Sequence, residues 1–176
     1  MTTWIAFLRG VNVGGRLLPM AELTTILEGL GCSAIQTYIQ SGNAIFGHAK
    51  ATASQLAERI GGAIEKRRGF RPKVLVLRVE ELAKAVAANP FRDAEGVPTS
   101  IHLFFLAAKP AGDRMRALDA IKSPTESIVL KGNVLYVHAP DGFGNSKLAQ
   151  RAEKILGVDA TARNWRTVTT VLGKAG

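Results

Sequence analysis

The sequence has few of the features of a secreted or membrane-anchored protein. It contains one cysteine, Cys32, among 176 residues, so no disulfide can form within the chain. Its first residues, MTTWIAFLRG, lack the basic stretch followed by a long apolar stretch that is typical of a signal peptide. No apolar run approaches the ~20 residues that a membrane-spanning helix requires. We therefore expect a cytoplasmic protein that does not span a membrane.

Acidic residues are also scarce. The chain has 14 Asp and Glu against 23 Lys and Arg, which gives a formal net charge of +9. Such a charge attracts polyanions, so nucleic acid is one candidate partner. There is no arginine-rich tail, however, and the densest basic cluster, between Lys66 and Lys73, lies at the predicted end of a helix, where cations are favoured.

Hydrophobic periodicity and turn residues predict an α+β fold. The order expected for the first half is strand, helix, strand, strand, helix, strand, which is the ferredoxin-like βαββαβ arrangement. Thr52 and Gln55 have the spacing of a capping box before the second helix. The expected elements are strands over 3–8, 34–40, 44–46 and 73–79, a helix after Pro19 and a helix after Thr52.

The second half repeats much of this order. Strands are expected over 100–107, 127–130 and 134–138, and helices over 113–121 and 146–156. The sequence shows no evident fourth strand, and it ends in RNWRTVTTVLGKAG, whose apolar spacing predicts a C-terminal helix. We therefore expect two related ferredoxin-like halves, over 1–79 and 100–176, of which the second is incomplete. A short helix and connection over 80–99 join them.

Three glycine-containing polar segments lie at predicted strand ends, and the first of them leads from a strand into a helix, where main-chain N–H groups can bind an anion. They are 9–16 (RGVNVGGR), 40–43 (QSGN) and 141–147 (DGFGNSK). Each also has a structural interpretation, as a tight crossover, a hairpin turn and a helix cap. Lys147 is unusual, because a cation in the first turn of a helix opposes the helix dipole.

The usual catalytic groups have little support. His48, His102 and His138 do not have the spacing of metal ligands, and Cys32 has the surroundings expected of a small core residue. No Gly-x-Ser-x-Gly motif is present. We expect no metal and no cofactor, and an enzyme of the hydrolase or transferase type would have to use Ser41 or Lys147 as its reacting group.

Four blocks of the sequence carry a family resemblance. They are FLRGVNVGG over 7–15, TYIQSGN over 37–43, Pro90-Phe91, and RNWRTV over 163–168. With these blocks in this order, the chain resembles the bacterial "domain of unknown function 1697" proteins. The resemblance implies a two-part α+β fold with ferredoxin-like elements in a stand-alone cytoplasmic protein, and it implies no activity.

The polar residues of these blocks and segments form the predicted ligand-binding set. The set comprises Arg9, Asn12, Gly14, Gly15, Gln40, Ser41, Asn43, Lys147, Arg163 and Asn164. The first hypothesis is a binding module for an anionic ligand, either a phosphorylated small molecule or a nucleic acid, in which Arg9 and Arg163 hold the anion. The alternatives are the enzyme above and a non-catalytic interaction domain, in which the polar blocks only hold the fold together.

Overall fold

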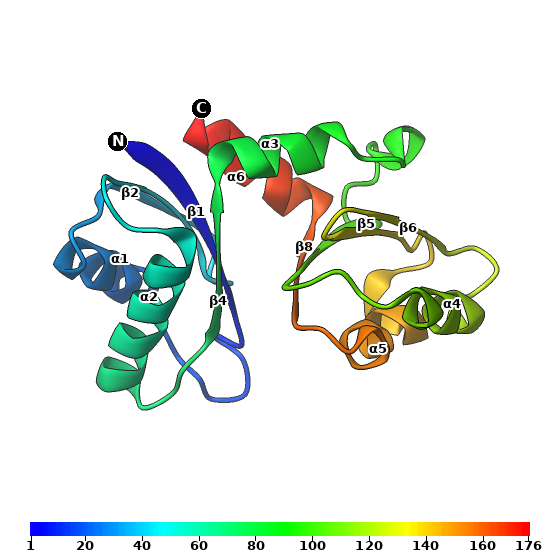
Figure 1. The fold of residues 1–176 in the computed structure, drawn as a ribbon, viewed down its shortest axis with the longest axis horizontal. Helices are drawn as coiled ribbons and strands as arrows, with labels where there is room; N and C mark the ends of the chain where they lie inside the picture. The colour runs from blue at the N-terminus through cyan, green and yellow to red at the C-terminus, as the bar shows by residue number, and fades with distance from the viewer. The chain divides into compact units, whose positions relative to one another are not determined.

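The computed structural model describes the whole chain, Met1–Gly176, as two compact units. Unit 1 consists of Met1–Lys84 and Thr170–Gly176, and unit 2 consists of Ala85–Thr169. The chain passes from unit 1 to unit 2 within α3 (Val79–Ala87) and returns within α6 (Trp165–Ala175). The architecture is α+β, with two four-stranded antiparallel sheets and six α-helices (Figure 1).

Unit 1 contains the sheet β2-β3-β1-β4, in which every neighbouring pair is antiparallel. Helices α1 and α2 cover one face of this sheet (Figure 1). Strand β1 lies between β3 and β4, where Trp4 is opposite Phe46 on one side and Arg78 on the other. The elements in chain order are β1 (Thr2–Arg9), α1 (Met20–Gly29), β2 (Ser33–Tyr38), β3 (Asn43–His48), α2 (Ala53–Arg68) and β4 (Lys73–Arg78).

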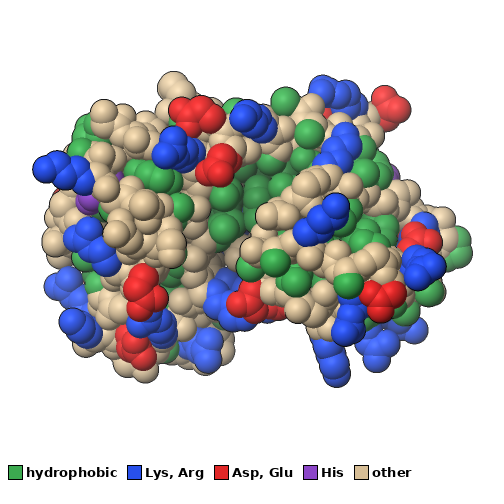
Figure 2. Space-filling view, in the orientation of Figure 1, with side chains coloured by type: hydrophobic (Ala, Val, Ile, Leu, Met, Phe, Trp, Pro, Cys, Tyr) green, Lys and Arg blue, Asp and Glu red, His purple; other side chains and the backbone are tan.

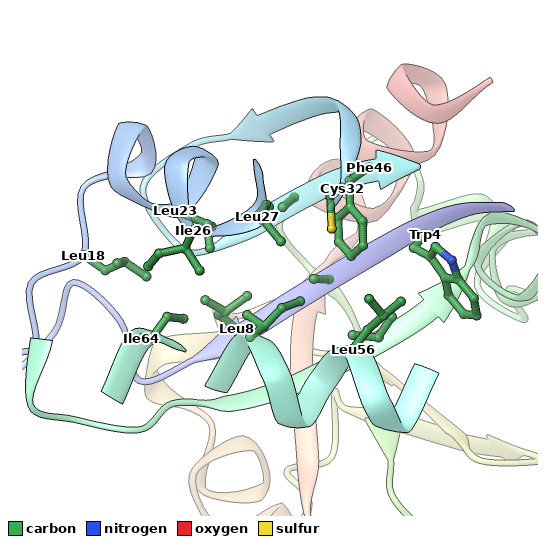
Figure 3. Packing of buried hydrophobic residues seen from close by; sticks show 14 of the residues in the cluster. Trp4, Leu8, Leu18, Leu23, Ile26, Leu27, Cys32, Phe46, Leu56 and Ile64 are labelled. Atoms are coloured by element: carbon green, nitrogen blue, oxygen red, sulfur yellow. The ribbon is translucent and has the colours of Figure 1, made fainter. Parts of the chain in front are cut away.

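The core of unit 1 lies between the sheet and these two helices. Alternate β1 residues, among them Trp4 and Leu8, face the helices because successive side chains of a strand point to opposite faces. They pack against apolar residues that recur every three or four positions along α1 and α2, including Leu23, Leu27 and Leu56 (Figure 3). Full burial of each such side chain stabilises the fold by roughly 1.5–3 kcal/mol.

Cys32 belongs to the same core. Its side chain lies within this cluster (Figure 3), and burial raises the pKa of its thiol. A raised pKa leaves less reactive thiolate. The expectation that Cys32 is a core residue is confirmed.

Unit 2 repeats the element order and the strand order of unit 1. Its sheet is β6-β7-β5-β8, with all neighbouring pairs antiparallel, and its core packs Phe104 and Leu106 of the sheet against Leu118, Leu148 and Leu156 of two helices. The elements are β5 (Ile101–Leu106), α4 (Gly112–Ile121), β6 (Ser127–Lys131), β7 (Val134–His138), α5 (Lys147–Leu156) and β8 (Ala160–Asn164), with short 3₁₀ turns η1 (Arg92–Ala94) and η2 (Phe143–Asn145).

Strand β8 is an element that the sequence does not predict. The prediction that the second half lacks its fourth strand is wrong, because Ala160–Asn164 pairs antiparallel with β5, with Phe104 opposite Ala162. The segment ATARN contains one β-branched residue and two alanines, so its local preference for a strand is weak. Its conformation comes from pairing with the buried central strand, which the local sequence does not reveal.

The starts of α2 and α5 follow the predicted capping chemistry. Thr52 and Gln55 form the expected capping box at α2, and Ser146 caps α5 by accepting a hydrogen bond from Ala149 N at 3.0 Å. Helices α2 and α5 end at Gly69 and Gly157 in the left-handed conformation that favours glycine. No helix of the chain has both the length and the apolar character needed to cross a membrane.

Candidate functional site

Asn12 holds together two of the predicted polar segments. Its Nδ2 donates hydrogen bonds to the main-chain oxygens of Leu18, at 2.9 Å, and Gln40. Its Oδ1 accepts one from Leu18 N at 2.9 Å. The residue has a φ of +55°, which asparagine tolerates better than most side chains. The amide therefore fixes the loop after β1 and ties it to the β2–β3 turn.

The β2–β3 turn is fixed by its own side chains. Asn43 is buried, and its Nδ2 donates to Tyr38 O at 3.0 Å and to Ser41 Oγ at 2.9 Å. Gly42 O accepts a hydrogen bond from Leu8 N at 2.8 Å. The turn thus packs directly on the end of β1, and the amide of Asn43 serves the fold.

The other predicted residues of unit 1 lie along the same two loops. Arg9, Gln40 and Ser41 are exposed, as are Gly14 and Gly15, which have positive φ angles. The loop closes on itself through hydrogen bonds from Asn12 N to Arg16 O and from Arg16 N to Val13 O. The structure therefore brings the two segments together, and backbone geometry accounts for the two glycines.

The predicted residues of unit 2 have different surroundings. Asn164 Oδ1 accepts a hydrogen bond from Thr167 N at 2.9 Å and so caps the start of α6. Arg163 Nη1 donates to Ala162 O at 2.9 Å, and burial lowers the pKa of its guanidinium to about 10. Lys147 is exposed and lines a pocket of about 360 Å³ that also contains two carboxylates, Glu126 and Asp141.

Unit 1 contains a pocket of about 480 Å³, which is larger than the pocket that Lys147 lines in unit 2. The sequence does not predict this pocket. It lies where the end of β3 meets the first two turns of α2. Within this pocket His48 Nδ1 accepts hydrogen bonds from Lys50 N at 3.3 Å and Ala51 N at 3.1 Å. An imidazole that accepts at Nδ1 carries its proton on Nε2 when neutral, so Nε2 remains available as a donor.

The charged groups of this pocket are mainly cationic. Arg59 Nη2 donates to Leu30 O at 3.0 Å, which fixes its guanidinium, and neither Arg59 nor Lys50 forms an ion pair. The one lining carboxylate, Glu58, forms an ion pair with Arg71. Two hydrogen bonds raise the pKa of Arg71, and the one with Glu58 has a larger effect than the one with Glu65. The pocket therefore presents two unpaired cations and a carboxylate whose charge is already compensated.

The densest basic cluster of the sequence is largely neutralised. Glu22 lies 3.2 Å from Arg68 and 3.6 Å from Arg67, while Arg71 pairs with Glu58 and Glu65. Lys and Arg side chains are scattered over the visible surface with Asp and Glu among them (Figure 2). A continuous basic face of the kind that binds nucleic acid is not evident in this view.

Sequence reasoning missed His48, Lys50 and Arg59 because they come from a strand end, a connection and the second turn of a helix. The capping box at Thr52 was a usable signal. It fixes the start of the helix, and Arg59 lies seven residues after Thr52, which places both on one side of the helix.

The chain belongs to the family described as "Protein of unknown function (DUF1697)", whose model matches residues 1–136. The resemblance seen in the sequence blocks is confirmed. Among solved structures, the conserved bacterial protein SP0830 from Streptococcus pneumoniae has 21% sequence identity and a TM-score of 0.76, with 99% of this chain and 98% of that chain covered. At this identity the similarity establishes a shared fold. No curated protein has significant sequence similarity to the chain.

Proposed function

We propose that the chain is a binding protein for a small ligand that carries a phosphate-like anionic group. The ligand binds in the unit 1 pocket, between the end of β3 and the first two turns of α2. The observation that carries this proposal is the pair of cations, Lys50 and Arg59, which line one pocket without forming ion pairs. A pocket of about 480 Å³ lies within the range of roughly 300–1,000 Å³ that is usual for small-molecule sites.

Each group at the pocket has a definite role in this proposal. Arg59 is held by Leu30 O and offers its remaining N–H groups to two oxygens of the anion. Lys50 adds a mobile charge, and His48 Nε2 and the Ser54 hydroxyl add neutral hydrogen bonds. The pairing of Glu58 with Arg71 reduces the repulsion that an unpaired carboxylate would exert on the anion.

The test is a calorimetric titration with inorganic phosphate, glycerol phosphate and a nucleoside monophosphate, at low and moderate salt. We expect Lys50→Met and Arg59→Met each to weaken binding about tenfold or more, because a hydrogen bond to a charged group contributes roughly 1.5–3 kcal/mol. Lys66→Met is the matched control, since it removes an exposed cation from the same helix but not from this pocket.

Two results would contradict the proposal. Equal weakening by Lys66→Met, together with loss of binding at moderate salt, would indicate general attraction to a basic surface. Binding of short RNA or DNA with a steep salt dependence, but not of the monophosphates, would favour the nucleic-acid form of the hypothesis.

A second candidate function is protein interaction through the two loops that Asn12 joins. Three of the five exposed large apolar side chains of the chain, Val13, Leu17 and Ile39, belong to these loops. Ile39 also has a φ of +47°, which is strained for a β-branched residue, and the residue is 50% exposed. Strain at an exposed position motivates a functional hypothesis.

This candidate function predicts that a protein partner binds through the side chains of these loops. We expect the double variant Val13→Ser/Leu17→Ser to lose any protein that the wild type retains in crosslinking, while its thermal stability stays within about 0.5 kcal/mol of the wild type, as is usual at the surface. Val97→Ser is the matched control, because Val97 is as exposed as Val13 and lies in unit 2. Retention by the double variant would exclude this surface.

We also propose that each unit has the ferredoxin-like fold. The support is the βαββαβ element order together with a sheet in which the first strand lies between the third and the fourth, in both units. This fold accommodates many functions, so it does not by itself favour one of the two candidates.

A further inference from the structure

The pocket of unit 2 that Lys147 lines contains an acidic side and a basic side. It has a volume of about 360 Å³ and lies between the α4–β6 connection and the β7–α5 loop. The acidic side consists of Glu126 and Asp141, and the basic side is Lys147. Unit 1 has its own pocket at the corresponding β3–α2 connection, but that pocket is mainly cationic.

Glu126 is a buried carboxylate without a counter-ion. The residue is only 7% exposed, and its Oε2 accepts one hydrogen bond, from Ser123 N at 2.8 Å. No Lys, Arg or His forms an ion pair with it. Burial of a carboxylate is unfavourable unless the charge is paired, so the acidic side of the pocket favours a cation.

Asp141 is positioned beside it by a chain of hydroxyl groups. Its Oδ2 accepts a hydrogen bond from Thr125 Oγ1, and Thr125 Oγ1 lies 3.1 Å from Ser123 Oγ. These contacts tie the β7–α5 loop to the turn that contains Glu126. They use one oxygen of Asp141 and leave the other to contribute to the acidic side.

Lys147 provides the opposite charge. It is the first residue of α5, whose first turn contains no acidic residue, so its ammonium group and the helix dipole have the same sign at this end. Although it lines the same pocket as Glu126 and Asp141, it forms an ion pair with neither, which means that each N–O distance exceeds 4.0 Å. The two charges of the pocket are separated, and neither is compensated by the protein.

We infer that this pocket binds a small zwitterion of the amino-acid class, with its ammonium group at Glu126 and Asp141 and its carboxylate at Lys147. A simple anion would be repelled by the two carboxylates, and a simple amine would leave Lys147 unpaired. A ligand that carries both charges pairs both sides of the pocket. The volume is near the lower end of the usual range for ligand sites, which suits a small ligand. This site is separate from the proposed phosphate pocket, and neither requires the other.

The test is a calorimetric titration of the full chain with each of the twenty common amino acids, and with acetate and ethylamine as ligands of a single charge. We expect at least one amino acid to bind at least tenfold more tightly than either acetate or ethylamine. Glu126→Gln and Lys147→Met should each weaken that binding by tenfold or more. Lys154→Met, an exposed cation in the last turn of the same helix, is the matched control and should leave binding unchanged.

The variants also separate this site from the other one. Lys50→Met should not affect amino-acid binding, and Lys147→Met should not affect phosphate binding. If Glu126→Gln fails to fold, Asp141→Asn tests the same acidic side, since Asp141 is exposed. The inference is overturned if no amino acid binds more tightly than acetate and ethylamine, or if binding survives in both Lys147→Met and the folded acidic-side variant.

Discussion

Gly42→Ala is expected to destabilise unit 1 by roughly 3–5 kcal/mol, as the sum of backbone strain and overpacking. Gly42 has a φ of +77°, a conformation that alanine adopts only with strain. A Cβ at this position would lie 2.7 Å from Leu8 Cβ and 2.8 Å from Val11 Cγ2. Both neighbours belong to the core cluster, so neither can move freely.

Gly14→Ala is the matched control for this prediction. Gly14 also has a positive φ, of +56°, but nothing lies within 4 Å of the Cβ that alanine would add. It should therefore cost only the backbone strain, roughly 1–2 kcal/mol. Urea unfolding followed by Trp4 fluorescence, in a Trp165→Phe background, measures both variants. Equal losses would show that the close approach of the turn to β1 does not require glycine.

This glycine illustrates how a sequence block can be conspicuous for structural reasons. QSGN and RGVNVGG were predicted to supply a ligand site, and they do meet at one edge of unit 1. Asn12 and Asn43, however, direct their amides at main-chain oxygens. An amide can bind a ligand or the backbone equally well, so residue type alone does not distinguish the two roles.

The fold was predictable wherever local signals agree with the tertiary environment. The capping box at Thr52 is such a local signal and was identified correctly, and the segment 141–147 does contain a helix cap, at Ser146. Strand β8 was missed because its alanines give it little strand preference and its pairing with β5 is a long-range contact. The same limit applies to function, because local patterns do not reveal which side chains of separate elements share a pocket.

Both candidate pockets depend on such long-range relations. Arg59 becomes a fixed cation through Leu30 O, and Glu58 is neutralised by Arg71, thirteen residues further along the chain. Glu126 is conspicuous only through its burial, which the turn sequence SPTES does not indicate. Lys147 is the exception. It was singled out from the sequence because its charge opposes the dipole of the helix that it begins.

A second large effect is expected from His102, which makes stability depend on pH. The ring stacks on Phe143, with centroids 3.4 Å apart, and its Nδ1 is buried without a hydrogen-bond partner. Burial lowers the pKa of His102 from 6.5 to about 4. As the pH falls, His102 is therefore protonated in the unfolded chain before it is protonated in the folded protein. The contribution of neutral His102 to stability is complete above pH 6.5 and is lost as the pH falls towards 4.

Between pH 7 and pH 5, His102 is expected to reduce the free energy of unfolding by roughly 2 kcal/mol. In His102→Phe, which keeps an aromatic ring against Phe143 and removes the titrating group, that reduction should be absent. Urea unfolding at the two pH values measures it, and comparing the variant with the wild type isolates His102 because the other two histidines are present in both. Phe143→Leu is the control that disturbs the stacking but keeps the titration. An unchanged pH dependence in His102→Phe would mean that the imidazole of His102 contacts water or a hydrogen-bond partner in the folded protein. The buried, unpaired Nδ1 would then not be the source of the pH dependence.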